Sequence, residues 1–310
     1  MRTLYEILNR RRISRGTLDF DLPEAEFVLN EKYEPVDILC PQRGEAERMI
    51  EEFMLKANEV VARLAKDTLT PLMYRVHENP DADRIRELEQ FLNIAAKPVH
   101  LGTQPHPGKL QAVLADNADS PAIDLIRKYT LRALKKAKYS ENPQGHYALA
   151  LEDYCHFTSP IRRYPDLIVH RMLKLLMDGD LDKREGWATR MGELANACSQ
   201  REQASIRAER DAGDIMKAAY MSRQIGRKYY GVISGVTAWG LYVTLPNTVE
   251  GLVHIAELDD YYDYDAKRQM LIGMTTGYIL KLGGQVRIRV DRVDVERGEI
   301  NFELIGFEGA

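Results

Sequence analysis

The chain has 310 residues, 45% of them hydrophobic and 29% charged, which is typical of a soluble globular protein of roughly two domains. Its 43 basic and 47 acidic residues give a net charge of -4, which argues against a protein that holds nucleic acid by overall charge alone. Three widely spaced cysteines without a CxxC pair indicate neither a disulfide scaffold nor a zinc site. No run approaches the ~20 apolar residues of a membrane span, so we expect a cytoplasmic protein with no membrane partner.

The first part of the chain is predicted to be a pair of strands followed by a long helix. Residues 16–22 and 25–30 alternate apolar with polar side chains around Pro23 and Glu24, as a half-buried hairpin would. Over residues 45–66 the apolar side chains instead recur with the period of an α-helix. The change of period predicts a hairpin that leads into a helix with one apolar face.

Helical patterns continue through the middle of the chain and are interrupted by a loop rich in Pro and Gly. The loop is expected at residues 97–109, and the helical segments are expected at residues 83–92, 121–138, 166–177 and 187–222.

After residue 222 the pattern changes to short β-rich runs separated by Gly, Asn and Asp. Five runs are expected, at residues 229–236, 240–245, 251–254, 286–294 and 299–304. They predict a small five-stranded barrel of about 80 residues. We therefore expect an α+β chain, with a mostly helical domain at residues 1–222 and a β-barrel domain at residues 223–310.

The most informative stretch is HFTSPIRRYPDL, at residues 156–167. It places Arg162 and Arg163 on a turn stiffened by prolines, and the rigid fork of donors on a guanidinium matches a phosphate. A structural helix-capping role for Arg162 is the alternative, but two adjacent arginines after Ser-Pro favour an anionic ligand.

Other polar groups of this stretch and of the residues that follow it are candidates for the same ligand. They are the side chains of Ser159, Tyr164 and His170. His156 and His170 are expected to have structural or ligand-positioning roles rather than catalytic ones.

Flat side chains in the predicted barrel could stack on nucleic-acid bases. Trp239, Tyr242 and His254 supply the rings, and Arg297 and Lys281 supply nearby cations. The alternative is that these rings fill the barrel core. Strand alternation places Tyr242 on the face opposite its two apolar neighbours and therefore favours an exposed ring.

Residues 156–167 resemble the signature of the ribonuclease II and ribonuclease R family of 3′-to-5′ exoribonucleases, known as the RNB family. Further blocks similar to this family follow its usual order, at residues 15–24, 50–58, 74–78, 145–151 and 208–211. Residues 235–243 and 250–258 closely resemble the S-one-type RNA-binding domain, an OB-fold. The ribonuclease R branch is the closer match, because the barrel follows the catalytic part directly.

The resemblance implies processive degradation of single-stranded RNA, and not of DNA, to nucleoside monophosphates. Arg162 matches the arginine that holds the scissile phosphate, and Glu209 matches a carboxylate that accepts a hydrogen bond from a ribose hydroxyl; both are candidate catalytic residues. Glu51 and Glu52 match another sugar-contacting position, with the choice between them open. Ser159, Arg163, Tyr164 and His170, together with the barrel residues, are the remaining RNA-binding candidates. Without the resemblance, Glu209 would be a solvated member of an ion pair.

The chain departs from this family in its metal ligands. The family holds Mg²⁺ with closely spaced aspartates upstream of the hairpin, and this chain begins after that point. The acidic cluster Asp259, Asp260, Asp263 and Asp265 does not reproduce the family motif.

We therefore expect no metal ligands in this chain and no activity from the chain alone. The alternative function is a single-stranded RNA-binding module, or a half-enzyme that needs a separate N-terminal piece. A third possibility, ranked last, is that the barrel only docks on a protein partner.

Overall fold

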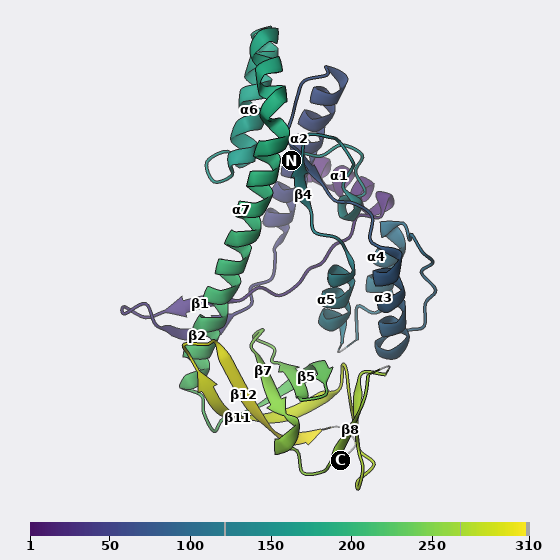
Figure 1. Cartoon of the computed structure of the whole chain (residues 1–310), viewed down its shortest axis with the longest axis vertical. Helices are drawn as coiled ribbons and strands as arrows, with labels where there is room; N and C mark the ends of the chain where they lie inside the picture. The colour runs from purple at the N-terminus through teal and green to yellow at the C-terminus, as the bar shows by residue number, and fades with distance from the viewer. Residues whose placement is uncertain (121, 267, 308–310) are drawn as a thin grey trace.

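The computed structural model describes residues 1–120, 122–266 and 268–307. Helices occupy most of the first two thirds of the chain, and a β-barrel follows at the opposite end of the molecule (Figure 1). The predicted α+β class is confirmed. None of the described helices is both long enough and apolar enough to cross a membrane.

The helices are more numerous than the pattern predicted. Their bounds are α1 Arg2–Arg15, α2 Glu45–Asp67, α3 Ala82–Ala95, α4 Pro107–Asp116, α5 Ile123–Ala133, α6 Tyr164–Met177 and α7 Leu181–Ser222. Of these, α2, α3, α6 and α7 confirm predicted helical segments. The predicted segment 121–138 is confirmed only in part, because α5 ends at Ala133 and Lys138 begins strand β4 (Lys138–Ser140); Pro121 lies outside the described residues. The long α7 runs from the top of the molecule down to the barrel and connects its two ends (Figure 1).

Two helices were not predicted, for different physical reasons. Helix α1 buries none of its side chains, so it has no apolar stripe to detect. Helix α4 begins inside the predicted loop 97–109, with Pro107 in its first turn, where a proline is tolerated because its missing N–H is not needed there. The imidazole of His106 caps α4 by accepting a hydrogen bond from the backbone N–H of Gly108.

The predicted hairpin partner was wrong. Strand β1 (Glu26–Leu29) pairs with the downstream strand β2 (Pro35–Leu39), and not with residues 16–22. The side-chain oxygen of Asn30 accepts hydrogen bonds from the backbone N–H groups of Lys32 and Glu34, which builds the turn between β1 and β2.

Residues 16–22 are held instead by distant parts of the chain. The backbone N–H of Leu18 donates to the carbonyl of Ala148 at 2.8 Å, and that of Asp19 donates to the side chain of Gln111 at 2.9 Å. The alternating pattern of this segment therefore reflects tertiary contacts and not a local hairpin.

The five-stranded barrel is confirmed. It is closed in the order β11-β12-β7-β6-β5, from strands β5 Lys228–Thr237, β6 Gly240–Thr244, β7 Glu250–His254, β11 Gln285–Asp294 and β12 Glu299–Phe307. Inward side chains such as those of Leu241, Val243 and Phe302 are fully buried. A three-stranded sheet is inserted between β7 and β11, made of β8 Tyr262–Asp265, β9 Met270–Gly273 and β10 Ile279–Lys281.

The barrel packs directly against the helical part. One hydrophobic core runs from α3, α4 and α5 into the barrel. Polar contacts reinforce the junction: Lys128 Nζ lies 2.9 Å from Glu250 Oε2, and Lys217 Nζ donates to the carbonyl of Thr248 at 2.9 Å. The domain boundary at residue 222 stays a prediction, but the barrel is held in one orientation by these contacts.

Candidate nucleic-acid interface

The signature turn projects Arg162 from the surface at the start of α6. The carbonyl of Ser159 accepts hydrogen bonds from the N–H groups of Arg162 at 3.3 Å and Arg163 at 3.0 Å. The side chain of Ile161, at the apex, is completely exposed, and the Arg162 side chain is exposed beside it. Within the described parts of the chain, no carboxylate forms an ion pair with Arg162, so its fork of donors is free.

Asp166 holds this turn from inside the protein. Its carboxylate is fully buried, and Oδ1 accepts hydrogen bonds from the Ser159 backbone N–H and from Arg163 Nη2, each at 2.8 Å. The two adjacent arginines therefore differ: Arg163 is paired, whereas Arg162 points outward. The predicted contact of Arg163 with RNA stays a prediction.

Asn58 of α2 fixes the segment that leads into the turn. Its side-chain amide donates to the hydroxyl of Tyr154 at 3.1 Å and accepts from the N–H of Phe157 at 3.0 Å. The Cys155 thiol is 3.4 Å from the Asn58 carbonyl. Sequence reasoning assigned Asn58 no role, although a polar side chain amid the apolar stripe of α2 was a usable signal.

A chain of buried and half-buried rings lies next to the turn. The Tyr139 hydroxyl lies 2.9 Å from His156 Nδ1, and the ring centroids of Tyr154 and His146 are 5.3 Å apart. Burial lowers the pKa of His156 to about 2, helped by repulsion from Arg163 and other nearby cations. Burial and neighbouring positive groups likewise lower the pKa of His146 to about 3. Both imidazoles are neutral at physiological pH, which suits structural roles.

His170 also supports the turn. Its ring stacks on Phe157 with centroids 4.3 Å apart, and Nε2 lies 2.9 Å from the carbonyl oxygen of Phe157. The Tyr164 ring, in contrast, is exposed in the first turn of α6. The RNA contacts expected of Ser159, Tyr164 and His170 stay predictions.

The paired glutamates near the start of α2 lie in different surroundings. Glu52 is buried against Arg12, and burial raises the pKa of its carboxyl while Arg12 opposes that rise. The Glu51 side chain is 44% exposed and lies 3.2 Å from Arg43 Nη1. Of the two candidates, Glu51 is therefore the one that a ribose could reach, by replacing Arg43.

Glu209 lies exposed on α7, nearer than Glu202 to the end of the helix that reaches the barrel. It follows Glu202 by seven residues, which places it two helical turns, about 10 Å, further along the same face. Glu202 accepts from Arg75 Nη1 at 2.6 Å, and the Arg75 guanidinium lies over the Tyr139 ring. This ion pair connects the face of α7 that carries Glu209 to Tyr139, one of the rings next to the turn.

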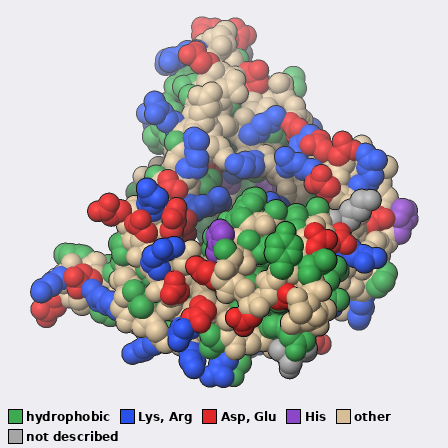
Figure 2. Space-filling view, turned by 60° about the horizontal axis from the view of Figure 1, so that its bottom comes forward, with side chains coloured by type: hydrophobic (Ala, Val, Ile, Leu, Met, Phe, Trp, Pro, Cys, Tyr) green, Lys and Arg blue, Asp and Glu red, His purple; other side chains and the backbone are tan. Residues whose placement is uncertain are grey.

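The barrel rings named from the sequence lie on its outer surface. Trp239, in the turn between β5 and β6, is 53% exposed, and its Nε1 donates to the Tyr242 hydroxyl at 3.4 Å. Tyr242 is half-buried and lies over Gly235, because its neighbours on β6 point inward. His254 and Arg297 are exposed. Figure 2 shows a hollow above the barrel, with Lys and Arg side chains on its helical side.

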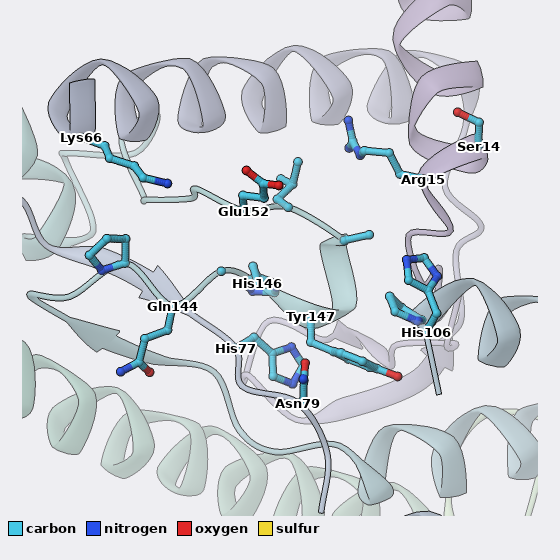
Figure 3. Close-up of a pocket in the computed structure, with 15 residues that line it drawn as sticks. Ser14, Arg15, Lys66, His77, Asn79, His106, Gln144, His146, Tyr147 and Glu152 are labelled. Atoms are coloured by element: carbon cyan, nitrogen blue, oxygen red, sulfur yellow. The ribbon is translucent and has the colours of Figure 1, made fainter. Parts of the chain in front are cut away.

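A separate polar cleft of about 800 Å³ lies between α1, α2 and the short helix η1 (Tyr147–Leu149). Arg15, His106 and Glu152 line it together with His146 (Figure 3). Its lining does not include Arg162. The cleft is therefore distinct from the predicted phosphate site.

Metal ligands do not gather in the described residues. Residues 1–120, 122–266 and 268–307 contain no group of three His, Cys, Asp or Glu side chains arranged to hold a metal ion. Asp260 of the barrel insertion accepts hydrogen bonds from the N–H groups of Thr275 and Thr276, which lower the pKa of its carboxyl. Both oxygens of the Asp260 carboxylate are therefore engaged within the turn that it builds.

Replacing Asp166 with alanine should destabilise the chain by about 3 kcal/mol, because Arg163 would lose its buried partner and the Ser159 N–H its acceptor. Urea denaturation measures the change. Asp178→Ala, which removes an exposed carboxylate, is the matched control and should shift the free energy of unfolding by less than about 0.5 kcal/mol. Equal effects of the two variants would contradict the role given to Asp166.

Acid should destabilise the fold through the buried histidines. Below pH ~6.5 His146 and His156 bind protons in the unfolded chain but stay neutral in the folded one. The free energy of unfolding therefore falls as the pH drops toward their lowered pKa values. His156→Gln should make the slope of unfolding free energy against pH shallower by about 1.4 kcal/mol per pH unit. An unaltered slope for His156→Gln would refute a neutral buried imidazole.

Comparison with known proteins agrees with this architecture. The RNB domain family model matches residues 1–179, and the S1 RNA binding domain model matches residues 223–305. Ribonuclease R of Aquifex aeolicus is 44% identical over 307 residues, which cover 98% of this chain and 44% of the relative. Ribonuclease R of Escherichia coli is 36% identical over 321 residues, which cover 100% of this chain and 40% of the relative.

Solved structures show the same fold. The apo form of Mycoplasma genitalium RNase R superposes with a TM-score of 0.91 at 30% identity, covering 98% of this chain and 48% of that one. Its complex with ribose methylated single-stranded RNA gives a TM-score of 0.90 at 31% identity, with the same coverage. The chain thus spans less than half the length of these relatives. With its RNB match over more than half of its residues and ribonuclease R proteins among its relatives, the chain belongs to the RNB family.

Proposed function

We propose that this chain supplies the phosphate-holding and RNA-binding part of a 3′-to-5′ exoribonuclease that degrades single-stranded RNA processively to nucleoside monophosphates. The observation that carries the proposal is the free guanidinium of Arg162 on a turn fixed by the buried carboxylate of Asp166. A donor held in place before the substrate arrives needs no reorganisation when charge builds up on the phosphate. The family match and the relatives named ribonuclease R support the same reaction class.

The arrangement of the other groups is consistent with a strand that runs from the barrel toward this turn. Trp239 and Tyr242 offer rings for stacking, and Glu209 lies on the barrel side of Glu202 along α7. Glu209 and Glu51 are proposed to accept hydrogen bonds from ribose hydroxyls, which DNA lacks at the 2′ position. Cytoplasmic location stays a prediction.

We further propose that the Mg²⁺ ions of the family reaction are held outside these 310 residues. The described side chains do not form a site for such an ion, so the chain by itself should bind RNA without cutting it. The same observation favours the second candidate function, an RNA-binding module or a half-enzyme completed by a separate N-terminal piece.

Incubation of the purified chain with 5′-labelled single-stranded RNA and Mg²⁺ tests both candidates. We expect the chain to bind the RNA without shortening it; a ladder of shortened products would refute the inactive-chain proposal. Tyr242→Ala should weaken binding by ~1 to 3 kcal/mol, the value of one base stacked on a ring. Tyr261→Ala, which removes another exposed tyrosine, is the control and should bind normally. If the Tyr242 and Tyr261 variants both bind like the unmodified chain, the barrel rings are not an RNA surface.

Arg162→Lys keeps the positive charge but loses the two-donor fork. In the enzyme assembled with its metal-binding segment, this change should lower kcat by about 100-fold or more, as the loss of one preorganised donor does elsewhere. Single-turnover cleavage measures the rate, and Arg201→Lys on the exposed side of α7 is the control. Wild-type rates for Arg162→Lys would rule out the phosphate clamp.

A further inference from the structure

The barrel carries a second combination of a ring and cations, away from Trp239 and Tyr242. Lys228 and Tyr230 on β5 lie opposite Arg289 and Arg287 on β11, and we call these four residues the β5–β11 patch. All four side chains point outward, because the residues between them on both strands turn toward the barrel interior. Tyr230 is 71% exposed. A ring and three cations therefore share one outer face of the sheet.

Tyr230 and Arg287 form a stacked pair. The guanidinium carbon of Arg287 lies 5.6 Å from the centroid of the Tyr230 ring, within the range of a cation–π contact. Arg287 covers one side of the ring, and the high exposure of Tyr230 leaves room for a base against the rest of it. On the opposite side of β11, Arg287 pairs with Gly306, where an added Cβ would meet open space.

The patch is rich in positive side chains, although the chain as a whole is negatively charged. The net charge is -4, yet three cations gather on this face. Two carboxylates lie near these cations: Glu303 accepts from Arg289 Nε at 2.6 Å, and the exposed Asp291 follows Arg289 by two residues on β11. Among the described residues, Lys228 and Arg287 have no ion-pair partner. A single exposed tyrosine is common on protein surfaces and does not indicate a binding site. A ring with unpaired cations beside it, in contrast, has the two elements of a surface that binds single-stranded nucleic acid.

The patch lies on the strand that also passes beneath Tyr242. Tyr230 is five residues from Gly235, over which Tyr242 lies, a separation of about 16 Å along β5. The carboxylate between them, that of Glu250, is engaged by Lys128, with Nζ and Oε2 2.9 Å apart, and accepts from Ser234 and Thr244. A polyanion that joined the two positions would therefore not meet an unpaired negative charge at Glu250.

We propose that the β5–β11 patch is a second contact site for single-stranded RNA, which stacks one base on Tyr230 and binds phosphates through Lys228 and Arg287. The proposal rests on the RNA-binding function proposed above and extends it to nucleotides beyond those at Trp239 and Tyr242. The barrel would then bind one RNA strand at two positions, the β5–β11 patch and the rings of Trp239 and Tyr242. Affinity should then depend on RNA length, with the second point engaged only by longer strands.

Fluorescence anisotropy with the full chain, in EDTA and with oligouridylates of about 4 and about 16 nucleotides, tests the proposal, since OB-folds bind within this range. Tyr230→Ala should weaken binding of the longer RNA about tenfold, the loss of one stacked base, and leave the shorter RNA unaffected. Tyr230→Phe, which keeps the ring, should restore binding of the longer RNA. Trp239→Ala should weaken both lengths, and Tyr261→Ala neither.

The salt dependence of RNA affinity tests the roles of Lys228 and Arg287 separately. Lys228→Gln and Arg287→Gln should each lower the slope of log affinity against log salt by about 0.7 for the longer RNA, the value of one phosphate contact on a single strand. Unchanged binding of the longer RNA by Tyr230→Ala, while Trp239→Ala weakens it, would overturn the second site and leave the proposed function standing. Equal weakening of both lengths by Tyr230→Ala would also overturn it. Failure of the unmodified chain to bind either RNA would reject the proposed function itself.

Discussion

The buried carboxylate of Asp166 is the constraint on which the candidate site depends. A charge without solvent is tolerated only when it is paired and hydrogen-bonded, and Asp166 is so held through Oδ1, which accepts from the Ser159 N–H and the Arg163 guanidinium. Its buried Oδ2 has no hydrogen-bond partner among the described residues. These bonds set the shape of the turn. They also separate two chemically identical neighbours, because Arg163 neutralises Asp166 while Arg162 remains free to meet an external anion.

Two long helices, α2 and α7, hold the turn in place relative to the rest of the protein. Asn58 of α2 holds the segment that enters the turn, and Glu202 of α7 holds Arg75 over the Tyr139 ring. Helix α7 continues to the barrel, where a shared hydrophobic core and the Lys128 contact fix the β-strands. The turn that carries Arg162 and the barrel rings of Trp239 and Tyr242 are thus parts of one packed structure, and their separation does not depend on a flexible linker.

The basic side chains of this mildly acidic chain fall into two groups, those paired with carboxylates and those left unpaired. Many basic side chains are committed to carboxylates, as Arg43 is to Asp19 and Asp21. The uncommitted cations of the described residues include Arg162 at the turn and Arg287 on the barrel. A mildly acidic protein can in this way bind a polyanion at chosen points and avoid nonspecific attraction over its whole surface. Placement of a few free guanidiniums therefore matters more than their total number.

Local sequence patterns were enough to predict the barrel strands, the helix α2 and the position of the Arg162 turn. These features follow from periods of two and 3.6 residues and from a continuous motif, which record how each residue relates to its near neighbours. Long-range packing, in contrast, causes β1 to pair with β2, buries Glu52 while Glu51 stays exposed, and brings Asn58 to the turn. Each of these outcomes depends on a partner distant in sequence or on the packing of a neighbouring helix, and a local period contains no record of either.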